Sequence, residues 1–405
     1  MAFTKSRCGQ RVTGDTLQKA KTGALVAGKT LNPLFIGSDI YRGSSYGGLH
    51  PLRVARVSTV IDLGRALGLF DAGRYRTSPT AKPAALTQWH SAAYIAALQA
   101  AETAGEVSDA VRARHGLGTP SNPIFAQMFK RPATGAGGVM LAAELLAGAN
   151  AGAVHVPGGG THHGMPDRAH GFCYLNDPVL GILTARRAGL RRVAYIDIDA
   201  HHGDGVEHGF AGDPAVMLIS VHEEARWPFT GLVGDDGGGN AFNLPVPRGF
   251  NDSEMRAVLQ RLILPRVAEF APDLIVLQAG ADALLEDPLS RLALSNNAHR
   301  AVLAGLRGLA PRLLLLGGGG YNPWSVARLW TLLWADLSGQ PVPDFLPPEA
   351  RSVLGALSWN RGARGLPDPA MLAQLQDKPR EGPVRAEITQ RLAQLAARPA
   401  WGQVG

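Results

Sequence analysis

Residues 195–205 read YIDIDAHHGDG and place three aspartates and two histidines directly after the segment RRVA. An apolar run that ends in ionisable residues is typical of a buried strand in a parallel β-sheet, where ligands bind beyond the carboxyl ends of the strands. Because strand side chains alternate, Asp197, Asp199 and His201 point the same way. Such groups are costly to desolvate together unless a cation lies among them. The stretch therefore predicts a divalent metal held by Asp199 and His201.

A third metal ligand is expected from another strand end. Asp282, in the segment LQAGADALLEDP, is the best candidate because it follows the apolar run at 274–278. Three protein ligands leave a fourth position for water, which is the pattern of catalytic zinc. The alternative is a set of helix-capping aspartates and ordinary core histidines. We favour the metal site because several such residues occur together after one apolar strand.

The rest of the chain alternates short apolar runs with helical stretches, which predicts a single α/β domain with a central parallel sheet flanked by helices on both faces. The expected strands are Ala153–Val156, Arg192–Ile198, Val216–Val221, Leu274–Gln278 and Arg312–Leu316, and the expected helices include Pro178–Ala188, Asp252–Phe270 and Asn296–Leu309. We expect an N-terminal extension at residues 1–33, a catalytic domain at 34–340 and a C-terminal helical extension at 341–405, which could form a contact between copies of the chain.

Composition narrows the class of protein. The 405 residues are 45% hydrophobic and 18% charged, as in a globular chain, and the net charge of +7 comes from scattered basic residues rather than a basic run. We therefore expect no nucleic-acid partner. The two cysteines, Cys8 and Cys173, cannot form a disulfide framework, and the sequence shows neither a secretory signal nor an apolar run of membrane-spanning length. A cytoplasmic protein without a membrane partner is expected.

Two glycine-rich segments bring further chemistry to the same edge of the predicted sheet. The segment PGGGTHHGMP at 157–166 contains His162 and His163, one of which can act as a general base toward a water molecule. Each imidazole needs a carboxylate on its other nitrogen, and Asp197 and Asp204 remain available for this. The segment LLLLGGGGYNPW carries Tyr321, a hydrogen-bond donor for an oxyanion. The alternatives are a surface histidine pair and a phosphate-binding loop, but the lysine and hydroxyl residue of a P-loop do not follow.

These segments, in order, resemble a known family. The matching motifs are HPLRVARV, PIF, GGTHHG, GFCYLND, YIDIDAHHGDGVEHGF, ISVH, GADAL with DP, and GGGGYN. Over residues 34–340 the chain resembles the zinc-dependent histone deacetylases, and most of all the bacterial acetoin utilization deacetylases, close to the class I pattern. The resemblance implies the arginase/deacetylase fold and hydrolysis of the amide of acetyl-lysine.

The resemblance also implies a role for each site residue. Asp199, His201 and Asp282 match the zinc ligands, and His162 and His163 match the tandem histidines, with Asp197 behind His162 and Asp204 behind His163. Tyr321 matches the oxyanion-polarising tyrosine. Phe172, Trp227, Gly171 and Gly319 match the substrate tunnel, and Arg56 matches an arginine near an inner acetate channel. One potassium ion would bind at Asp197, Asp199, His201, Ser220 and Val221, and a second would use carbonyls such as those of Phe210 and Val216, its last ligand being unassigned.

Departures from the family pattern leave the substrate open. The loop HGLGTPSNPIF at 115–125 lacks the aspartate with which class I enzymes clamp a peptide backbone, and Glu223 and Glu224 are expected to add negative charge at the mouth of the site. An acetylated protein is the first expectation for the substrate, and an acetylpolyamine is the alternative. A binuclear manganese ureohydrolase is less favoured because Leu284 stands where arginases carry another aspartate. An inactive interaction module would have lost Tyr321 or a metal ligand, and neither is lost.

Overall fold

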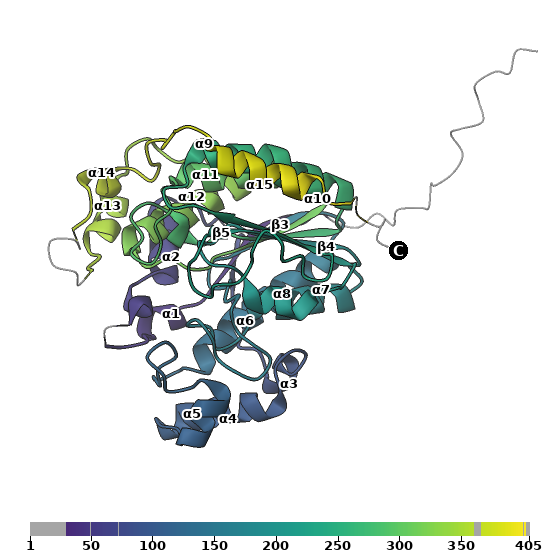
Figure 1. The fold of residues 1–405 in the computed structure, drawn as a ribbon. Helices are drawn as coiled ribbons and strands as arrows, with labels where there is room; N and C mark the ends of the chain where they lie inside the picture. The colour runs from purple at the N-terminus through teal and green to yellow at the C-terminus, as the bar shows by residue number, and fades with distance from the viewer. Residues whose placement is uncertain (1–29, 49, 72, 360–365, 400, 402–405) are drawn as a thin grey trace, which may run out of the picture.

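The computed structural model describes residues 30–48, 50–71, 73–359, 366–399 and 401. Within them, one eight-stranded sheet runs in the order β2-β1-β3-β8-β7-β4-β5-β6, and every strand pair is parallel (Figure 1). The strands are β1 (Leu31–Gly37), β2 (Tyr75–Thr77), β3 (Gly152–Val156), β4 (Val193–Asp197), β5 (Val216–Glu223), β6 (Ala241–Val246), β7 (Leu274–Gln278) and β8 (Arg312–Leu316). The predicted α/β class with a parallel sheet is confirmed.

Helices cover both faces of the sheet, as predicted, and the alternation of strand side chains explains how. Ala194 and Ile196 of β4 join the cluster beneath the helices drawn above the sheet in Figure 1, while Val193 and Tyr195 join the cluster on the opposite face. The upper layer contains α2 (Val57–Ala66), α9 (Asp252–Val258), α10 (Leu264–Phe270), α11 (Asn296–Leu306), α12 (Pro323–Ser338) and α15 (Ala386–Ala396). The lower layer contains α6 (Lys130–Ala147), α7 (Asp177–Arg187) and α8 (Asp204–Phe210).

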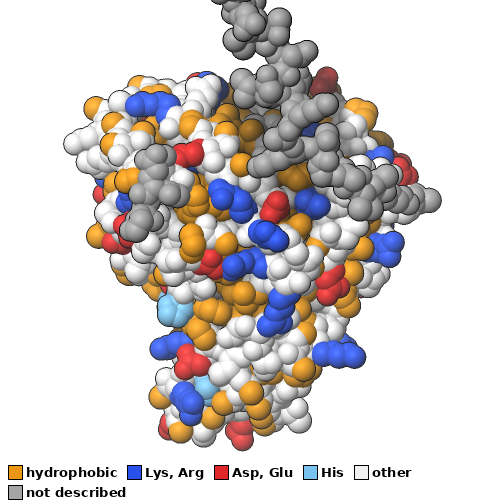
Figure 2. Space-filling model, turned by 90° about the vertical axis from the view of Figure 1, so that its right-hand side faces the viewer, with side chains coloured by type: hydrophobic (Ala, Val, Ile, Leu, Met, Phe, Trp, Pro, Cys, Tyr) orange, Lys and Arg blue, Asp and Glu red, His pale blue; other side chains and the backbone are white. Residues whose placement is uncertain are grey.

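The remaining α-helices lie outside these layers. They are α1 (Ile40–Gly43), α3 (Pro83–Leu86), α4 (Ala92–Ala104), α5 (Asp109–His115), α13 (Pro348–Gly355) and α14 (Pro369–Ala373). Among the described residues, none of the helices combines the length and apolar character that crossing a membrane requires. On the face shown in Figure 2, Lys and Arg side chains lie among acidic, apolar and uncharged ones.

Several elements differ from the sequence prediction, and strands β1, β2 and β6 were not among the expected strands. Strand β1 begins at Leu31, three residues before the expected domain boundary, and the edge strand β6 was not predicted because Asn243 and Pro245 interrupt its apolar pattern. Proline is tolerated at a sheet edge, where one backbone N–H has no strand to pair with. The helix expected at 252–270 contains a π-helical turn at Leu259–Ile263, two residues before Pro265, whose ring and missing N–H disfavour regular α-helical bonding.

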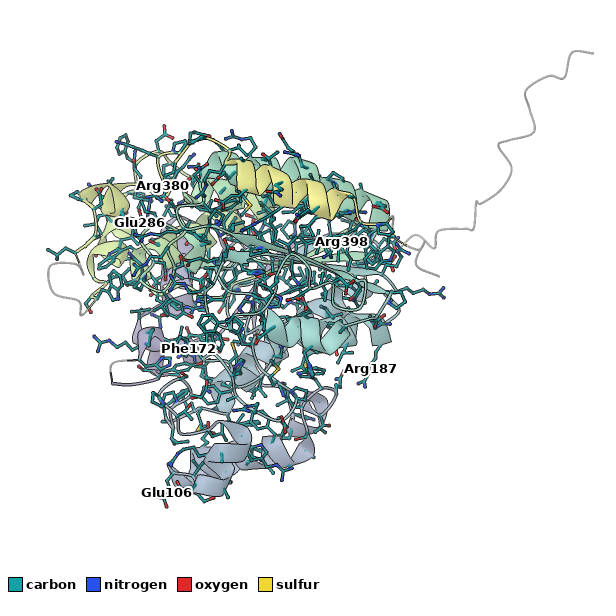
Figure 3. The ribbon with its side chains drawn as sticks, viewed as in Figure 1. Glu106, Phe172, Arg187, Glu286, Arg380 and Arg398 are labelled. Carbon is teal, nitrogen blue, oxygen red and sulfur yellow. The ribbon has the colours of Figure 1, made fainter. Side chains whose placement is uncertain are left out.

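The C-terminal segment packs on the catalytic domain. Ile388, Leu392 and Leu395 of α15 are fully buried in the upper core, so this apolar face is not available to another copy of the chain. Arg266 of α10 donates to the carbonyls of Leu395, Ala396 and Arg398, which end α15. Ahead of α15 in the chain, Arg380 pairs with Glu286 (Figure 3). Residues 1–29 of the expected N-terminal extension lie outside the described residues.

A buried histidine gives a first prediction on stability. His155 of β3 is fully buried, neither ring nitrogen has a partner among the described residues, and burial lowers its pKa to about 3. His155→Leu removes this unsatisfied polar ring and should raise the free energy of unfolding by about 1–3 kcal/mol at pH 8. Because the folded pKa lies below the unfolded value of 6.5, the wild type loses stability as the pH falls below 6.5. The gain should therefore be about 2 kcal/mol larger at pH 5.

Urea unfolding at both pH values measures this effect, and His90→Leu is the control. His90 is also buried, but its Nδ1 lies 3.0 Å from the Met165 carbonyl and its Nε2 accepts a hydrogen bond from Asn176 N. His90→Leu should therefore destabilise the protein at pH 8. A His155→Leu protein that is less stable than wild type at pH 5 would show that the ring is satisfied in solution.

Candidate metal centre and active site

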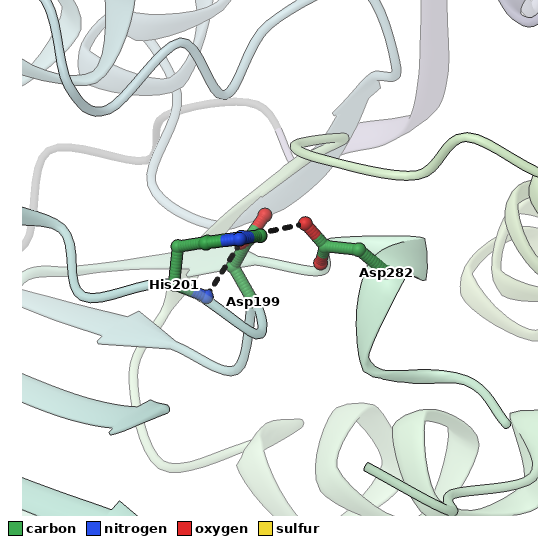
Figure 4. Close-up of side chains that lie close together, drawn as sticks. All are labelled: Asp199, His201 and Asp282. Carbon is green, nitrogen blue, oxygen red and sulfur yellow. Dashed lines mark hydrogen bonds and ion pairs between the residues drawn. The ribbon is translucent and has the colours of Figure 1, made fainter. Parts of the chain in front are cut away.

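Two carboxylates and one imidazole meet at the carboxyl ends of β4 and β7, which are neighbours in the sheet. Asp199 and His201 follow β4, and Asp282 lies in a 3-10 turn at Ala281–Ala283 after β7. One potential ligand atom from each residue lies within 4.8 Å of the others, and His201 Nδ1 is 3.0 Å from Asp282 Oδ2 (Figure 4). This set of O and N donors around one point fits a divalent transition metal such as zinc.

The pKa shifts of the two carboxylates also indicate that this site fits a metal cation. Burial raises the pKa of Asp282, and the nearby negative charge of Asp199 raises it further. Burial alone would also raise the pKa of Asp199, but His162 and His201 outweigh that effect and lower it. Two carboxylates this close do not both ionise easily without a counter-charge, and a bound cation supplies one.

Glycine lets the backbone approach these carboxylates. An added Cβ at Gly280 would lie 2.0 Å from Asp199 Oδ2, and one at Gly319 would lie 1.9 Å from Asp282 Oδ2. Gly319 N donates to Asp199 Oδ2 at 2.7 Å, and Ala200 N donates to Asp282 Oδ1 at 3.0 Å. The glycine run after β8 therefore orients the metal-binding side chains, besides lining the cavity where the tunnel was expected.

The tandem histidines each bind the carboxylate expected behind them. His162 Nδ1 lies 2.8 Å from Asp197 Oδ2, and His163 Nδ1 lies 2.7 Å from Asp204 Oδ1. Burial lowers the pKa of His163 to about 3, with His162 adding to the effect. Burial would also lower the pKa of His162, but Asp197 and Asp199 outweigh it and raise the value to about 9. The pair thus combines a neutral imidazole with a cationic one.

Tyr321 lies at the same cavity with its backbone held in place. Its N–H donates to Asp287 Oδ2 at 2.6 Å, and its ring packs edge-on against Phe172 with centroids 5.8 Å apart. Burial raises the pKa of the Tyr321 phenol, and the charges of Asp282 and Asp199 raise it further. The hydroxyl therefore stays protonated and can act as a donor.

The cavity is lined by aromatic and basic side chains as well as by the candidate metal ligands. Its volume of about 70 Å³ has room for roughly five water molecules, and Gly171, Phe172, Tyr321, both tandem histidines and the three metal-binding residues line it. Trp227 is not a lining residue. Its ring packs on His163 at 4.7 Å, and an added Cβ at Gly171 would lie 2.2 Å from it.

Arg56 and Arg131 are the two arginines among the residues that line this cavity. Arg56 donates to the Gly318 carbonyl and lies over the Trp330 ring, while Arg131 lies 5.0 Å from the Tyr46 ring centroid. Arg56, expected near an inner acetate channel, therefore lies at the same cavity as the candidate metal ligands, and Arg131 adds a second guanidinium group that was not predicted. Two guanidinium groups suit a small carboxylate there.

Comparison with known proteins places the chain. Residues 50–337 match the histone deacetylase domain. The chain belongs to the histone deacetylase family. It is 34% identical to the acetoin utilization protein AcuC of Bacillus subtilis over 78% of this chain and 84% of that protein, and 34% identical to histone deacetylase 8 of Xenopus tropicalis over 72% and 80%. A crystal structure of a histone deacetylase homologue from Aquifex aeolicus superposes with a TM-score of 0.85 at 35% identity, covering 91% of this chain and all of that one.

Glu223 and Glu224, which were expected to add negative charge at the mouth of the site, are both paired with arginines in this deacetylase. The Glu223 side chain is only 7% exposed, and its Oε2 accepts from Arg226 Nε at 2.8 Å and from Arg291 N at 2.8 Å. Glu224 pairs with Arg391 of α15 at 2.9 Å. The two glutamates therefore do not add the free negative charge expected there, because the guanidinium groups of Arg226, in the same loop, and Arg391, distant in sequence, pair with them.

The residues expected around a first potassium ion lie together in this deacetylase. Asp197 of β4 is the register partner of Ser220 of β5. The carbonyls of Asp199 and His201 accept no hydrogen bond from any described residue, so they are available to a cation. Ser220 Oγ is instead 2.9 Å from His222 Nδ1. The carbonyls of Phe210 and Val216, expected at a second site, have a different partner that is described below.

Several residues that shape the deacetylase site were not predicted. His170 Nδ1 lies 3.3 Å from Asp204 Oδ2, so Asp204 contacts two imidazoles, and the Tyr195 hydroxyl donates to Asp197 Oδ2 at 2.8 Å. Asp177 accepts from the backbone of Gly160 and Thr161 and so holds the loop that carries the tandem histidines. His170 in the segment RAHGF carried a visible signal, since it adds another imidazole near the site. Asp177 resembled an ordinary helix-start aspartate.

Neighbouring histidines provide a test of the metal centre. The wild-type chain should bind one transition-metal ion, measured by inductively coupled plasma mass spectrometry after dialysis, and His201→Ala should lose most of it because one of three ligands is gone. His202→Ala is the control, since His202 bonds Thr230 and Glu207 outside the cluster. Full metal retention in His201→Ala, or two ions per wild-type chain, would contradict this site.

Proposed function

We propose that this protein is a zinc-dependent deacetylase that removes acetyl groups from lysine side chains of proteins. The observation that carries the proposal is that one cavity is lined by three candidate metal ligands, two carboxylate-paired histidines and a protonated tyrosine. These are the groups that metal-assisted amide hydrolysis needs: an electrophile, a base and an oxyanion donor.

Each residue receives one role. Zinc held by Asp199, His201 and Asp282 would polarise the amide carbonyl and acidify the attacking water. Asp204 binds Nδ1 of His163, which leaves Nε2 free to take a proton from the water and then to deliver it to the departing amine. His162, kept cationic by Asp197, stabilises developing negative charge, and the Tyr321 hydroxyl donates to the oxyanion.

The cavity suits an acylated linear amine and its product. The Phe172 ring buries the methylene chain of an acyl-lysine, while a neutral amide enters a dehydrated site at less cost than a free ammonium group. Arg56 and Arg131 line the same cavity, and their guanidinium groups would stabilise the acetate that leaves the reaction.

Protein lysine is favoured over the two alternatives. An acetylpolyamine would need accessible negative charge, and Glu223 and Glu224 are both paired with arginines. A binuclear ureohydrolase would need a further carboxylate, but Leu284 is apolar and 1% exposed, and the described residues hold a single cluster of metal-binding side chains.

Tyr321→Phe tests the oxyanion donor. The substitution removes one hydroxyl and leaves the metal ligands intact, so kcat on an acetyl-lysine peptide should fall by about 10²–10³-fold while bound zinc is unchanged. Steady-state kinetics and metal analysis on the same sample measure both quantities. Turnover within a few fold of wild type would show that Tyr321 does not contact the reacting carbonyl.

Substitutions of the two histidines should lower kcat by different amounts. His163→Ala removes the proton acceptor and should nearly abolish kcat at every pH, by about 10²–10⁴-fold. His162→Ala removes an electrostatic contribution and should cost less. The pH dependence of kcat for both variants and wild type measures this difference. If His163→Ala retains more activity than His162→Ala, the two roles are reversed.

Substrate choice is tested by comparing kcat/KM for acetyl-lysine peptides, acetylated proteins and acetylspermidine. We expect the peptide and protein substrates to be hydrolysed faster than acetylspermidine, because no unpaired carboxylate of the mouth attracts a cationic amine. The assignment fails if wild-type enzyme hydrolyses acetylspermidine well and leaves every acetyl-lysine substrate untouched. Arginine hydrolysis with bound manganese would instead support the ureohydrolase.

A further inference from the structure

Three backbone carbonyls converge on one side-chain nitrogen where α8 turns into β5. Asn240, which directly precedes β6, is 2% exposed. Its Nδ2 donates to the carbonyls of Phe210, Asp213 and Val216 at 2.7, 3.1 and 2.9 Å. The orientation of the amide follows from its other end, because Oδ1 accepts a hydrogen bond from Gly212 N at 3.2 Å.

The arrangement has more acceptors than the amide has hydrogens. An amide nitrogen carries two hydrogens, yet three carbonyl oxygens surround it. Converging carbonyl dipoles of this kind are how proteins replace the hydration shell of potassium. Phe210 and Val216 are also the residues whose carbonyls the family resemblance assigns to a second potassium ion. That position is occupied here by a side chain of the chain itself.

We propose that the Asn240 amide replaces the second potassium ion, so that this chain binds potassium at the first site alone. At the first potassium site no side chain takes the place of the ion, because the carbonyls of Asp199 and His201 accept no hydrogen bond from the described residues. A cation at the second position would have to displace the Asn240 amide and leave its buried nitrogen without partners.

The replacement has a structural consequence for the active site. The hydrogen bonds from the Asn240 amide to the three carbonyls fix the end of α8. Asp204, which binds His163, begins the same helix. Asn240 also joins the neighbouring strand, because its carbonyl accepts from Leu218 N of β5 at 2.9 Å. The anchoring of α8 at this end therefore does not depend on the potassium concentration.

Cation counting on the zinc-loaded full chain tests the proposal. Bound rubidium, a potassium substitute, is measured per chain by equilibrium dialysis in choline chloride buffer for wild type, Asn240→Ala and Asn296→Ala. Asn240→Ala removes the amide and leaves the carbonyls facing a hole, so it should bind one more rubidium ion per chain than wild type. Asn296 is an equally buried asparagine whose amide serves one carbonyl, that of Leu375, so Asn296→Ala should match wild type.

Thermal unfolding gives an independent readout. In choline chloride, Asn240→Ala should unfold at least about 2–4 °C below wild type, and potassium chloride should recover more of this loss than it adds to wild type or to Asn296→Ala. Equal rubidium counts in wild type and Asn240→Ala would overturn the proposal, and so would two bound ions in wild type. Neither readout uses catalysis, so failure here is distinct from failure of the proposed function.

Discussion

The structure depends on one constraint: carboxylates and imidazoles that are almost fully buried must be compensated where they lie. Asp199 and Asp282 are at most 1% exposed, and His201 is shared between them. Removing such groups from water without compensation costs several kcal/mol per ion. Backbone N–H donors and imidazoles supply part of that compensation, and a cation bound at the candidate site would supply the rest.

The sheet topology satisfies this constraint. The strands β3, β8, β7 and β4 are consecutive in the sheet, so the loops that follow them meet at one edge. These loops carry the tandem histidines, the glycine run with Tyr321, Asp282, and the Asp199–His201 pair. In parallel sheets this edge is where sites form, and the central position of these strands buries it. The glycines after β8 then permit a contact that any side chain would block.

Much of this arrangement could be predicted from sequence, and the remainder could not for physical reasons. The spacing of Asp197, Asp199 and His201 follows from strand alternation, and five of the strands follow from their apolar composition. The pairing of Glu224 with Arg391 could not be predicted, because Arg391 comes from a helix more than a hundred residues later. The hydrogen bonds of the Asn240 amide could not be predicted either, because its acceptors are backbone carbonyls, which every residue type carries.

The most direct test of the account is the thermal unfolding of the wild-type chain with and without a zinc chelator. If a cation compensates the buried carboxylates, chelation should lower the unfolding midpoint, and adding zinc back should restore it, since a ligand that binds only the folded state stabilises it. A variant that lacks both carboxylates, Asp199→Asn with Asp282→Asn, should not respond to the chelator. An unchanged or higher midpoint for the chelated wild type would contradict the account.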